Sequence, residues 1–462
     1  MVAANTAPSV SETLAAWIEG LSVDDIPEPA RREAENTIID TVALTVAALE
    51  TDYGLAVHKA FDQRGDCTVF GLADGFESAA AAVINGTCGH GEDYDNTYEG
   101  CPVHSGVVIV PALFAAGELM KLPASEVAKG VVVGIEIACR LGLVAKKAVH
   151  AAGFHPTAIL GAMGAAGGVA AAMGQDRSQI RDSLGVAGSM ASGIIEYLAD
   201  GTWTKRMHPG WAAQAGLRAA QMGAAGFRGP TTVFEGTHGL FSAFAPSIEP
   251  DFQPLVGELG QRWETARVAF KPYACGTMTQ PFVDCAVRLG RQGIKPEDIK
   301  SIVCEVGEGT VHRLWEPLGN KQRPPTAYAA KFSSPYCVAA GLLYGDAGLA
   351  QFTEAAVRDP RALALAGKVG YVIDPDNEYP ANYTGHIRAE LNDGRVVEER
   401  QGQLRGGTRE PMSREDLLAK ARANLAFSGR PAEATDRLAA FATGLFDAAG
   451  GFSAAALRRP GT

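Results

Sequence analysis

Three histidines in this chain lie beside residues that commonly begin helices. His104 precedes Ser105, a residue type favoured at helix N-caps, and His155 and His208 each precede a proline that suits a first helical position. The positive end of a helix disfavours the imidazolium form, so His155 and His208 are expected to be neutral and basic at neutral pH. The pattern predicts a group of acid–base residues delivered by helix starts.

Carboxylates and cations accompany these histidines in the sequence. Residues 88–105 form a polar segment that contains Asp93. Lys205 and Arg206 lie just before the third histidine, His208, and Lys271 follows later in the chain. A neutral base beside ammonium groups can remove a proton from a carbon next to a carboxylate, while the cations stabilise the enediolate charge that develops. The residue types and their spacing alone therefore predict a cofactor-independent acid–base enzyme that acts on a carboxylate.

Two other kinds of site are weaker interpretations of the same residues. Cys88, His90, Cys101 and His104 could form a zinc site, but their spacing is unlike that of common zinc sites, and small buried thiols explain the cysteines as well. The glycines in 161–168 resemble a phosphate-binding loop, but they follow a helix start rather than a strand. We expect no metal ion and interpret these glycines as helix-packing positions.

The composition excludes several classes of protein. The 462 residues are 47% hydrophobic and 20% charged, which is typical of globular chains and long enough for two domains. A net charge of −11 argues against a nucleic-acid partner but allows a small anionic substrate in a local cationic pocket. The eight cysteines contain no CxxC pair, and no signal peptide or apolar run of membrane length is evident. We therefore expect a cytoplasmic protein without a membrane partner.

The first part of the chain predicts a helical domain rich in alanine and glycine. No strand-like alternation of any length is evident before residue 260, and the helix at 78–87 is expected to end at Gly86. The expected helices cover residues 10–20, 28–50, 78–87, 105–121, 124–149, 156–174, 176–198 and 209–227.

The pattern changes near Lys271. Residues 300–307 alternate as in a strand, and the turn Asn392-Asp393-Gly394 between 386–391 and 396–400 predicts a hairpin. Further helices are expected at 278–293, 327–345, 353–358, 360–368, 413–426 and 431–448. The fold prediction is mainly α: a large all-helical domain built from residues 1–267 and 406–462, with a smaller inserted α+β lid domain at 268–405.

Several motifs, taken in order, resemble one known family. Residues 92–97 (Glu-Asp-Tyr-Asp-Asn-Thr) resemble a family segment Asp-Phe-Asp-Asp-Thr, and residues 153–157 (Gly-Phe-His-Pro-Thr) resemble Gly-Trp-His-Pro-Thr. Residues 204–210 are similar to a Lys-Arg-x-His-x-Gly segment, and residues 271–273 and 325–333 to two further family stretches. The sequence thus resembles the MmgE/PrpD family over nearly its whole length. That family includes 2-methylcitrate dehydratase, cis-aconitate decarboxylase and iminodisuccinate epimerase.

The resemblance implies a helical domain with an α+β lid, a homodimer, and no required organic cofactor. It implies a di- or tricarboxylate substrate that loses water, loses carbon dioxide or is inverted at one carbon. The residues that match the family's active site by position are Asp93, Thr97, His104, His155, Lys205 and Lys271.

The resemblance also suggests roles for these residues. His155 would be the main acid–base group, and Lys205 would bind a carboxylate or transfer a proton. His104 would be a second acid–base group, with Asp93 orienting it or binding a substrate hydroxyl through water, and Lys271 would hold another carboxylate. We also assign three further residues to substrate binding: Arg206, His208 and Gln280.

The sequence departs from the family at positions that bear on the reaction. Asn96 replaces an aspartate, and Gly276 and Gln280 occupy positions where the family usually carries histidines. The leading hypothesis is a lyase of the 2-methylcitrate dehydratase type. An epimerase of an amino- or hydroxy-dicarboxylate, a cis-aconitate decarboxylase and a non-catalytic carboxylate-binding protein remain alternatives.

Overall fold

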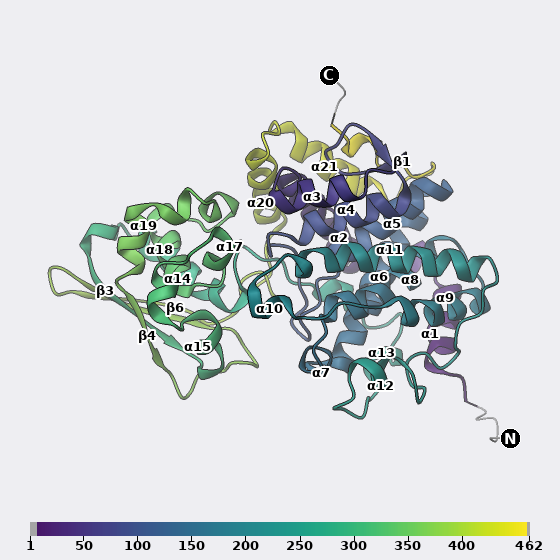
Figure 1. The fold of residues 1–462 in the computed structure, drawn as a ribbon, viewed down its shortest axis with the longest axis horizontal. Coiled ribbons are helices and arrows are strands. Elements are labelled where there is room, and N and C mark those ends of the chain that lie inside the picture. Colours follow the sequence, from purple (N-terminus) through teal and green to yellow (C-terminus); the bar gives the residue numbers. More distant parts are fainter. Residues whose placement is uncertain (1–6, 460–462) are drawn as a thin grey trace. The chain divides into compact units, whose positions relative to one another are not determined.

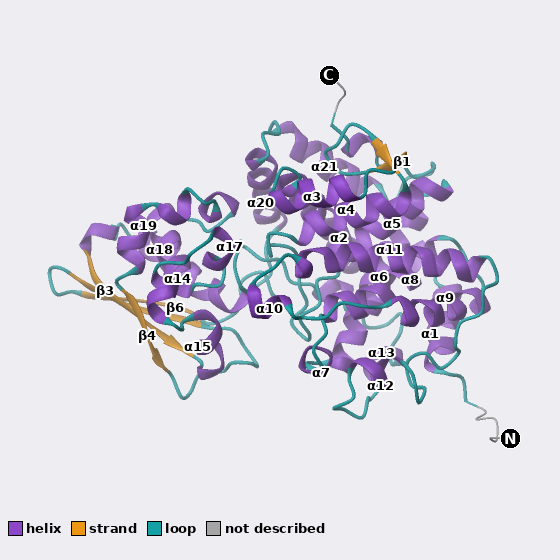
Figure 2. Ribbon diagram, viewed as in Figure 1, coloured by secondary structure: helices purple, strands orange, loops and turns teal. Residues whose placement is uncertain are grey.

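The computed structural model describes residues 7–459, which divide into two compact units. The helical unit contains the described residues up to Gly91, then Asp95–Val268, and the chain from Leu418 onward. The mixed unit contains Glu92–Tyr94 and Ala269–Leu417. Helices predominate in the described chain, which confirms a mainly α fold (Figure 2). Among the described residues, no helix combines the length and apolar composition needed to cross a membrane.

The helical unit is a stack of closely packed helices (Figure 1). Its longer helices are α1 (Val10–Gly20), α2 (Glu28–Ala48), α3 (Asp52–Ala60), α4 (Ser78–His90), α5 (Gly106–Met120), α6 (Ala124–Ala145), α8 (Pro156–Ala172), α9 (Arg177–Met190), α11 (Thr204–Ala224) and α21 (Glu433–Gly444). Helix α20 (Arg414–Phe427) leads back into this unit. Shorter helices are α7 (Ala148–Ala151), α10 (Tyr197–Asp200), α12 (Leu240–Phe244) and α13 (Gln253–Val256).

Helix α8 lies at the centre of this stack, and every residue in it is buried. It contacts α5, α6, α9 and α11. A Cβ added at Gly164 or at Gly168 would lie 2.5 Å from a backbone oxygen of α6, so glycine at these positions allows the two helices to touch. The glycines of 161–168 therefore serve helix packing, as the sequence indicates.

The helical unit differs from the prediction in several places. The helix expected at 176–198 ends at Met190, and α3 was not predicted. Strands β1 (Arg64–Thr68) and β2 (Gly75–Phe76) form a small antiparallel sheet, so the unit is not all-helical as predicted. Helix α4 continues past Gly86 to His90. Helix α11 begins at Thr204, so Pro209 lies inside it rather than at its first position. The prediction of a helix start at 209 was wrong. Proline has no backbone N–H to donate, but the packing of neighbouring helices against α11 offsets the loss of that one hydrogen bond.

The mixed unit is built on a four-stranded sheet of order β4-β3-β5-β6. Its strands are β3 (Ile299–Val306), β4 (Val369–Ile373), β5 (Gly385–Leu391) and β6 (Val396–Gln401). The hairpin β5–β6 forms as predicted, with Gly394 at a φ of 86°, whereas β4, parallel to β3, was not predicted. Helices of this unit are α14 (Gln280–Arg291), α15 (Glu308–Leu314), α16 (Leu318–Gln322), α17 (Ala327–Ala330), α18 (Ser334–Tyr344) and α19 (Pro360–Ala366).

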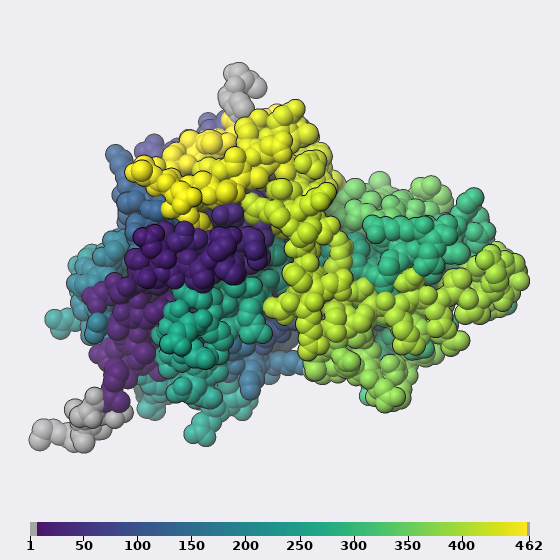
Figure 3. All heavy atoms as spheres, turned by 180° about the vertical axis from the view of Figure 1, so that it is seen from behind, coloured from purple at the N-terminus to yellow at the C-terminus, as the bar shows by residue number. Residues whose placement is uncertain are grey.

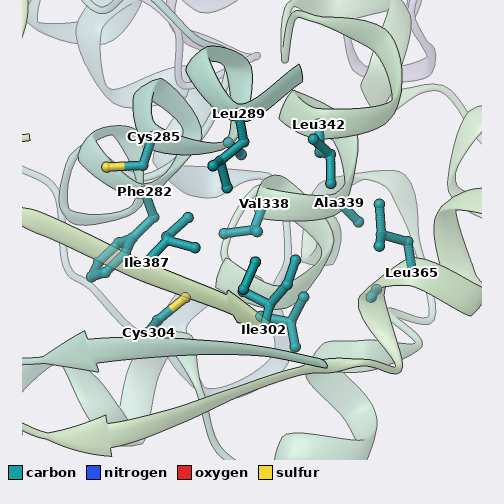
Figure 4. Packing of buried hydrophobic residues seen from close by; sticks show 14 of the residues in the cluster. Phe282, Cys285, Leu289, Ile302, Cys304, Val338, Ala339, Leu342, Leu365 and Ile387 are labelled. Carbon is teal, nitrogen blue, oxygen red and sulfur yellow. The ribbon is translucent and has the colours of Figure 1, made fainter. Parts of the chain in front are cut away.

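The core of the mixed unit lies between the sheet and helices α14 and α18. Phe282 and Leu289 of α14 face Ile302 of β3 and Ile387 of β5 in this core, and Val338 of α18 completes the layer (Figure 4). All five side chains are buried. The alternating burial of β3 follows from this arrangement, because only one face of the strand meets the helices.

The C-terminal helices pack against the N-terminal part of the helical unit. Helix α21 contacts α2, and Figure 3 shows the yellow C-terminal chain lying against the purple N-terminal chain. In the preceding helix, α20, the ammonium of Lys420 lies 2.7 Å from the Asp40 carboxylate of α2, and both side chains are buried. A buried ion pair of this kind ties the last part of the chain to helix α2.

Candidate active site

Two of the predicted histidines form a buried pair. His155 is the N-cap residue of α8, with Pro156 at the first helical position as predicted, and His208 lies in the second turn of α11. Their Nδ1 atoms are 3.2 Å apart. A hydrogen bond between two such nitrogens needs one donor and one acceptor, so one ring carries its hydrogen on Nδ1 and the other does not. The pair is therefore fixed in complementary tautomers.

His208 was expected beside a helix start, and the structure does not place it there. Helix α11 begins four residues earlier in the chain than His208, at Thr204, so this histidine owes its position to helix packing rather than to the positive end of α11. Gly193 fits against its ring. A Cβ added at Gly193 would lie 3.3 Å from the imidazole and 2.7 Å from the Ala158 Cβ.

A second group of three side chains is centred on Asp95. The Oδ2 atom of this carboxylate lies 2.9 Å from His90 Nδ1 and 3.2 Å from His104 Nδ1. His90 is the last residue of α4, and His104 lies two residues before α5. Ser105 occupies the N-cap position of α5 as predicted, but its hydroxyl makes no capping hydrogen bond. The backbone N–H of His104 donates to the Thr157 hydroxyl at 3.1 Å.

The two groups join into one row of four imidazoles. The ring centroids are 4.8 Å apart for His104 and His90, 5.6 Å for His90 and His155, and 5.3 Å for His155 and His208. The ring of Tyr197 lies against both His155 and His208. The sequence suggested His90 only as a zinc ligand, because the helix that carries it was expected to end four residues earlier.

Burial keeps three of these histidines, His90, His155 and His208, neutral. Loss of solvent lowers the pKa of His90 and that of His208 to about 4, and lowers the pKa of His155 well below its ordinary value. The positive charge of Lys205 contributes to the lowering of all three pKa values. At neutral pH each of these rings therefore keeps a lone pair that can accept a proton.

The other predicted residues of the helical unit lie near this row or support it. Lys205 is half-buried in the first turn of α11, and its charge acts on three of the histidines. The buried Arg206 stacks its guanidinium on the Tyr53 ring, 4.3 Å from the ring centroid. Thr97 is buried two residues after Asp95. The stacking of Arg206 on an aromatic ring indicates a packing contribution besides the substrate-binding role expected from the sequence.

The remaining predicted residues belong to the mixed unit. The Lys271 ammonium donates to the backbone oxygen of Asp93 at 2.7 Å and lies 3.4 Å from its carboxylate. Asp93 has a φ of 53°, a left-handed conformation that this contact holds in place. The Gln280 amide donates to the backbone oxygen of Cys275 at 3.2 Å, so it holds its own loop together. Both Lys271 and Gln280 are buried.

The zinc site considered from the sequence does not assemble from its cysteines. Cys88 packs in an apolar cluster, and the Cys101 thiol donates to the backbone oxygen of Lys146. A different trio, His90, Asp95 and His104, offers ligand atoms that all lie within 4.8 Å of one another. Two imidazoles and a carboxylate are a chemically suitable donor set for a divalent cation.

Comparison with known proteins places the chain in a family. The profile of the MmgE/PrpD N-terminal domain matches residues 12–253, and that of the C-terminal domain matches residues 273–442. The cis-aconitate decarboxylase of Aspergillus terreus is 26% identical over 449 residues, which are 90% of this chain and 89% of that protein. The human cis-aconitate decarboxylase is 28% identical over 432 residues, covering 90% and 88%.

The cis-aconitate decarboxylase-like protein oryM of Aspergillus oryzae is 27% identical over 417 residues, which are 85% of each chain. The Aspergillus terreus and human relatives are enzymes by name, and all three relatives match the chain over most of its length. The two domain profiles together cover most of the helical unit, including its row of histidines, and most of the mixed unit. The chain therefore belongs to the MmgE/PrpD family.

Proposed function

We propose that this protein is a cofactor-independent lyase that transfers a proton at a carbon atom of a di- or tricarboxylate. The observation that carries the proposal is the buried pair of His155 and His208 within electrostatic reach of Lys205. A neutral imidazole and a nearby ammonium supply a base and a carboxylate-binding cation, which are the groups that carbon-acid chemistry requires.

The reaction to test first is decarboxylation of cis-aconitate or a similar unsaturated tricarboxylate. In that reaction the carbon–carbon bond to one carboxylate breaks, its electron pair shifts into the unsaturated system, and a proton is added to carbon. One proton is consumed for each carbon dioxide released. His155 would deliver this proton, because the negative charge of a bound polycarboxylate raises the pKa of a neighbouring imidazole and lets it protonate. The curated relatives named above support this choice.

Dehydration of a hydroxylated tricarboxylate of the 2-methylcitrate type is the second candidate. The same pair of histidines favours it, because burial leaves His155 deprotonated before substrate arrives. A deprotonated imidazole can withdraw the proton next to a carboxylate, and a second group protonates the departing hydroxyl. Lys205 or His104 would fill that second role. Epimerisation would need the same withdrawal followed by return of the proton to the opposite face.

Proton NMR in heavy water distinguishes these reactions in one experiment. The purified protein is incubated with cis-aconitate, methylcitrate, citrate, malate and iminodisuccinate in separate samples. We expect deuterium to enter one of these compounds together with loss of carbon dioxide or of water, and mass spectrometry identifies which. Deuterium entry without any other change in mass would indicate an epimerase.

His155→Ala and His238→Ala provide the matched comparison. His155→Ala should lower the rate roughly 100-fold or more, because it removes the proton-transferring group. His238 is exposed, and its replacement should leave the rate unchanged. A folded wild-type protein that exchanges and converts none of the five compounds would count against the proposal and favour a protein that only binds carboxylates.

A further inference from the structure

The carboxylate of Asp95 is shared by two imidazoles. Its side chain is fully buried, and one oxygen, Oδ2, lies within hydrogen-bond distance of His90 Nδ1 and of His104 Nδ1. An ionised carboxylate can only accept hydrogen bonds, so each Nδ1 must carry its hydrogen and each Nε2 must carry the lone pair. The contact thus sets which nitrogen of each ring is basic.

Asp95 is held in its ionised form by these contacts. Burial alone would raise the pKa of its carboxyl, but the electrostatic interactions and hydrogen bonds that the two imidazoles make with it outweigh burial and lower that pKa. The backbone around the carboxylate is also fixed, because the side-chain oxygen of Asn96 accepts from the Gly106 N–H at 3.0 Å. Asp95 is therefore a rigid acceptor at the centre of the loop.

The two imidazoles differ in one respect that makes the arrangement testable. His104 Nδ1 also lies 3.0 Å from the backbone oxygen of Asn96, an acceptor that no side-chain substitution removes. His90 Nδ1 has the Asp95 carboxylate as its only hydrogen-bond partner recorded in the described chain, and its Nε2 is buried without one. Asp95 alone therefore determines the tautomer of His90, whereas His104 has two acceptors.

We propose that Asp95 is a positioning residue that holds His90 as the Nδ1–H tautomer and, together with the Asn96 backbone oxygen, holds His104 in the same form, leaving Nε2 as the basic nitrogen of each. This inference rests on the proposed function for its catalytic consequence, because His104 can take or return a proton at Nε2 only in this tautomer. The ring of His90 lies between those of His104 and His155, so a change in its tautomer or orientation also alters the surroundings of both neighbouring rings. Neither Asp95 nor His90 stood among the site residues assigned from the sequence.

Nitrogen NMR of histidine-labelled protein tests the tautomers without any substrate. Long-range proton–nitrogen spectra separate a protonated ring nitrogen from one with a lone pair, and His90→Gln and His104→Gln assign the two signals. In the wild-type protein at neutral pH we expect Nδ1–H for both rings. Finding Nε2–H on either ring would overturn the proposal, whatever the enzyme's activity.

Asp95→Asn makes the comparison between the two rings. We expect His90 to populate the Nε2–H tautomer in this variant, while His104 keeps Nδ1–H because of the Asn96 backbone oxygen. An unchanged His90 signal in folded Asp95→Asn would show that the carboxylate does not set its tautomer. Asp182→Asn, at a buried aspartate of α9, controls for general effects of removing a buried charge.

Activity and metal content supply the two remaining outcomes. With whichever compound the heavy-water experiment shows to be turned over, Asp95→Asn should lower kcat roughly 100-fold and change KM little. The substitution frees the His90 ring beside His155 and removes one of the two acceptors of His104, but leaves the carboxylate-binding cation in place. A wild-type protein without any turnover would refute the proposed function while leaving the tautomer result intact. One tightly bound divalent ion per chain, whose removal by a chelator shifts the His90 and His104 signals, would instead make Asp95 a metal ligand and overturn the positioning role.

Discussion

Acid should destabilise the helical unit because it contains histidines that are buried in the neutral form. The pKa of His90 and of His208 is about 4 in the folded chain against a model-peptide value of 6.5. Between these two values the unfolded chain binds protons that the folded chain does not bind, so stability falls as the pH is lowered. The stabilisation is fully present above about pH 6.5 and is lost as the pH falls towards about 4.

The size of the effect follows from the same two values. At about pH 5 the unfolded imidazole is almost fully protonated and the folded one is almost neutral, which costs about 2 kcal/mol for each histidine. His90 and His208 together should therefore lower the free energy of unfolding by about 4 kcal/mol relative to about pH 7.5. His155, whose pKa is lowered further, adds to this loss in the same direction.

His208→Phe isolates one part of the effect. At neutral pH the variant should be less stable by about 1–3 kcal/mol, because His155 loses its Nδ1 partner in a buried site. At about pH 5 the difference from wild type should shrink by about 2 kcal/mol, because the phenyl ring takes up no proton on unfolding.

Urea unfolding measured from about pH 7.5 to 5 provides the assay. Tryptophan fluorescence follows the helical unit, which contains four of the five tryptophans, Trp17, Trp203, Trp211 and Trp263. The exposed His238→Phe controls for the added ring. A difference in unfolding free energy between wild type and His208→Phe that stays constant with pH would refute the argument that burial keeps this histidine neutral.

Two substitutions test the packing of the helical unit. Lys420→Met should cost about 3–5 kcal/mol in urea unfolding, because it leaves the buried Asp40 carboxylate without its cation, and adding Asp40→Asn should restore part of the loss. A loss below about 1 kcal/mol would show that the pair is not desolvated. Gly86→Ala should cost about 1–3 kcal/mol in the same assay, since the new Cβ would lie 2.6 Å from the Gly210 Cα. A neutral effect there would show that α4 and α11 can separate without penalty.

The sequence predicts those elements whose signals are local. Pro156 marks the first residue of α8 because its fixed φ and missing donor suit that position. The hairpin β5–β6 follows from Asn392-Asp393-Gly394, since the glycine supplies the positive φ that the turn needs. Strand β4 gives no such signal. Its pairing partner β3 lies far away in the sequence, and its own residues, Val-Gly-Tyr-Val-Ile, do not alternate between apolar and polar.

Glycine was misinterpreted where its role depends on a neighbouring helix. Gly86 was expected to end its helix, yet it lies inside α4, where a Cβ would meet the backbone of Gly210 in α11. A Cβ at Gly210 would in turn lie 2.3 Å from the backbone oxygen of Val83. The two glycines let the helices touch, and the packing gained at this crossing offsets the low helix propensity of glycine. No single-helix pattern reveals such a pair.

The same misinterpretation concealed the centre of the candidate site. With α4 ending at Gly86, His90 falls in a loop and has no fixed relation to Asp95. With α4 continued to His90, the ring is carried on a rigid helix, and the following loop returns Asp95 to within 2.9 Å of it. The roles inferred for His104 and His155 came from short motifs. The contact of Asp95 with His90, by contrast, requires α4 to continue past Gly86, where α4 crosses α11. Gly86→Ala should therefore disturb the His90 tautomer as well as stability, linking the packing of α4 to the chemistry of the row.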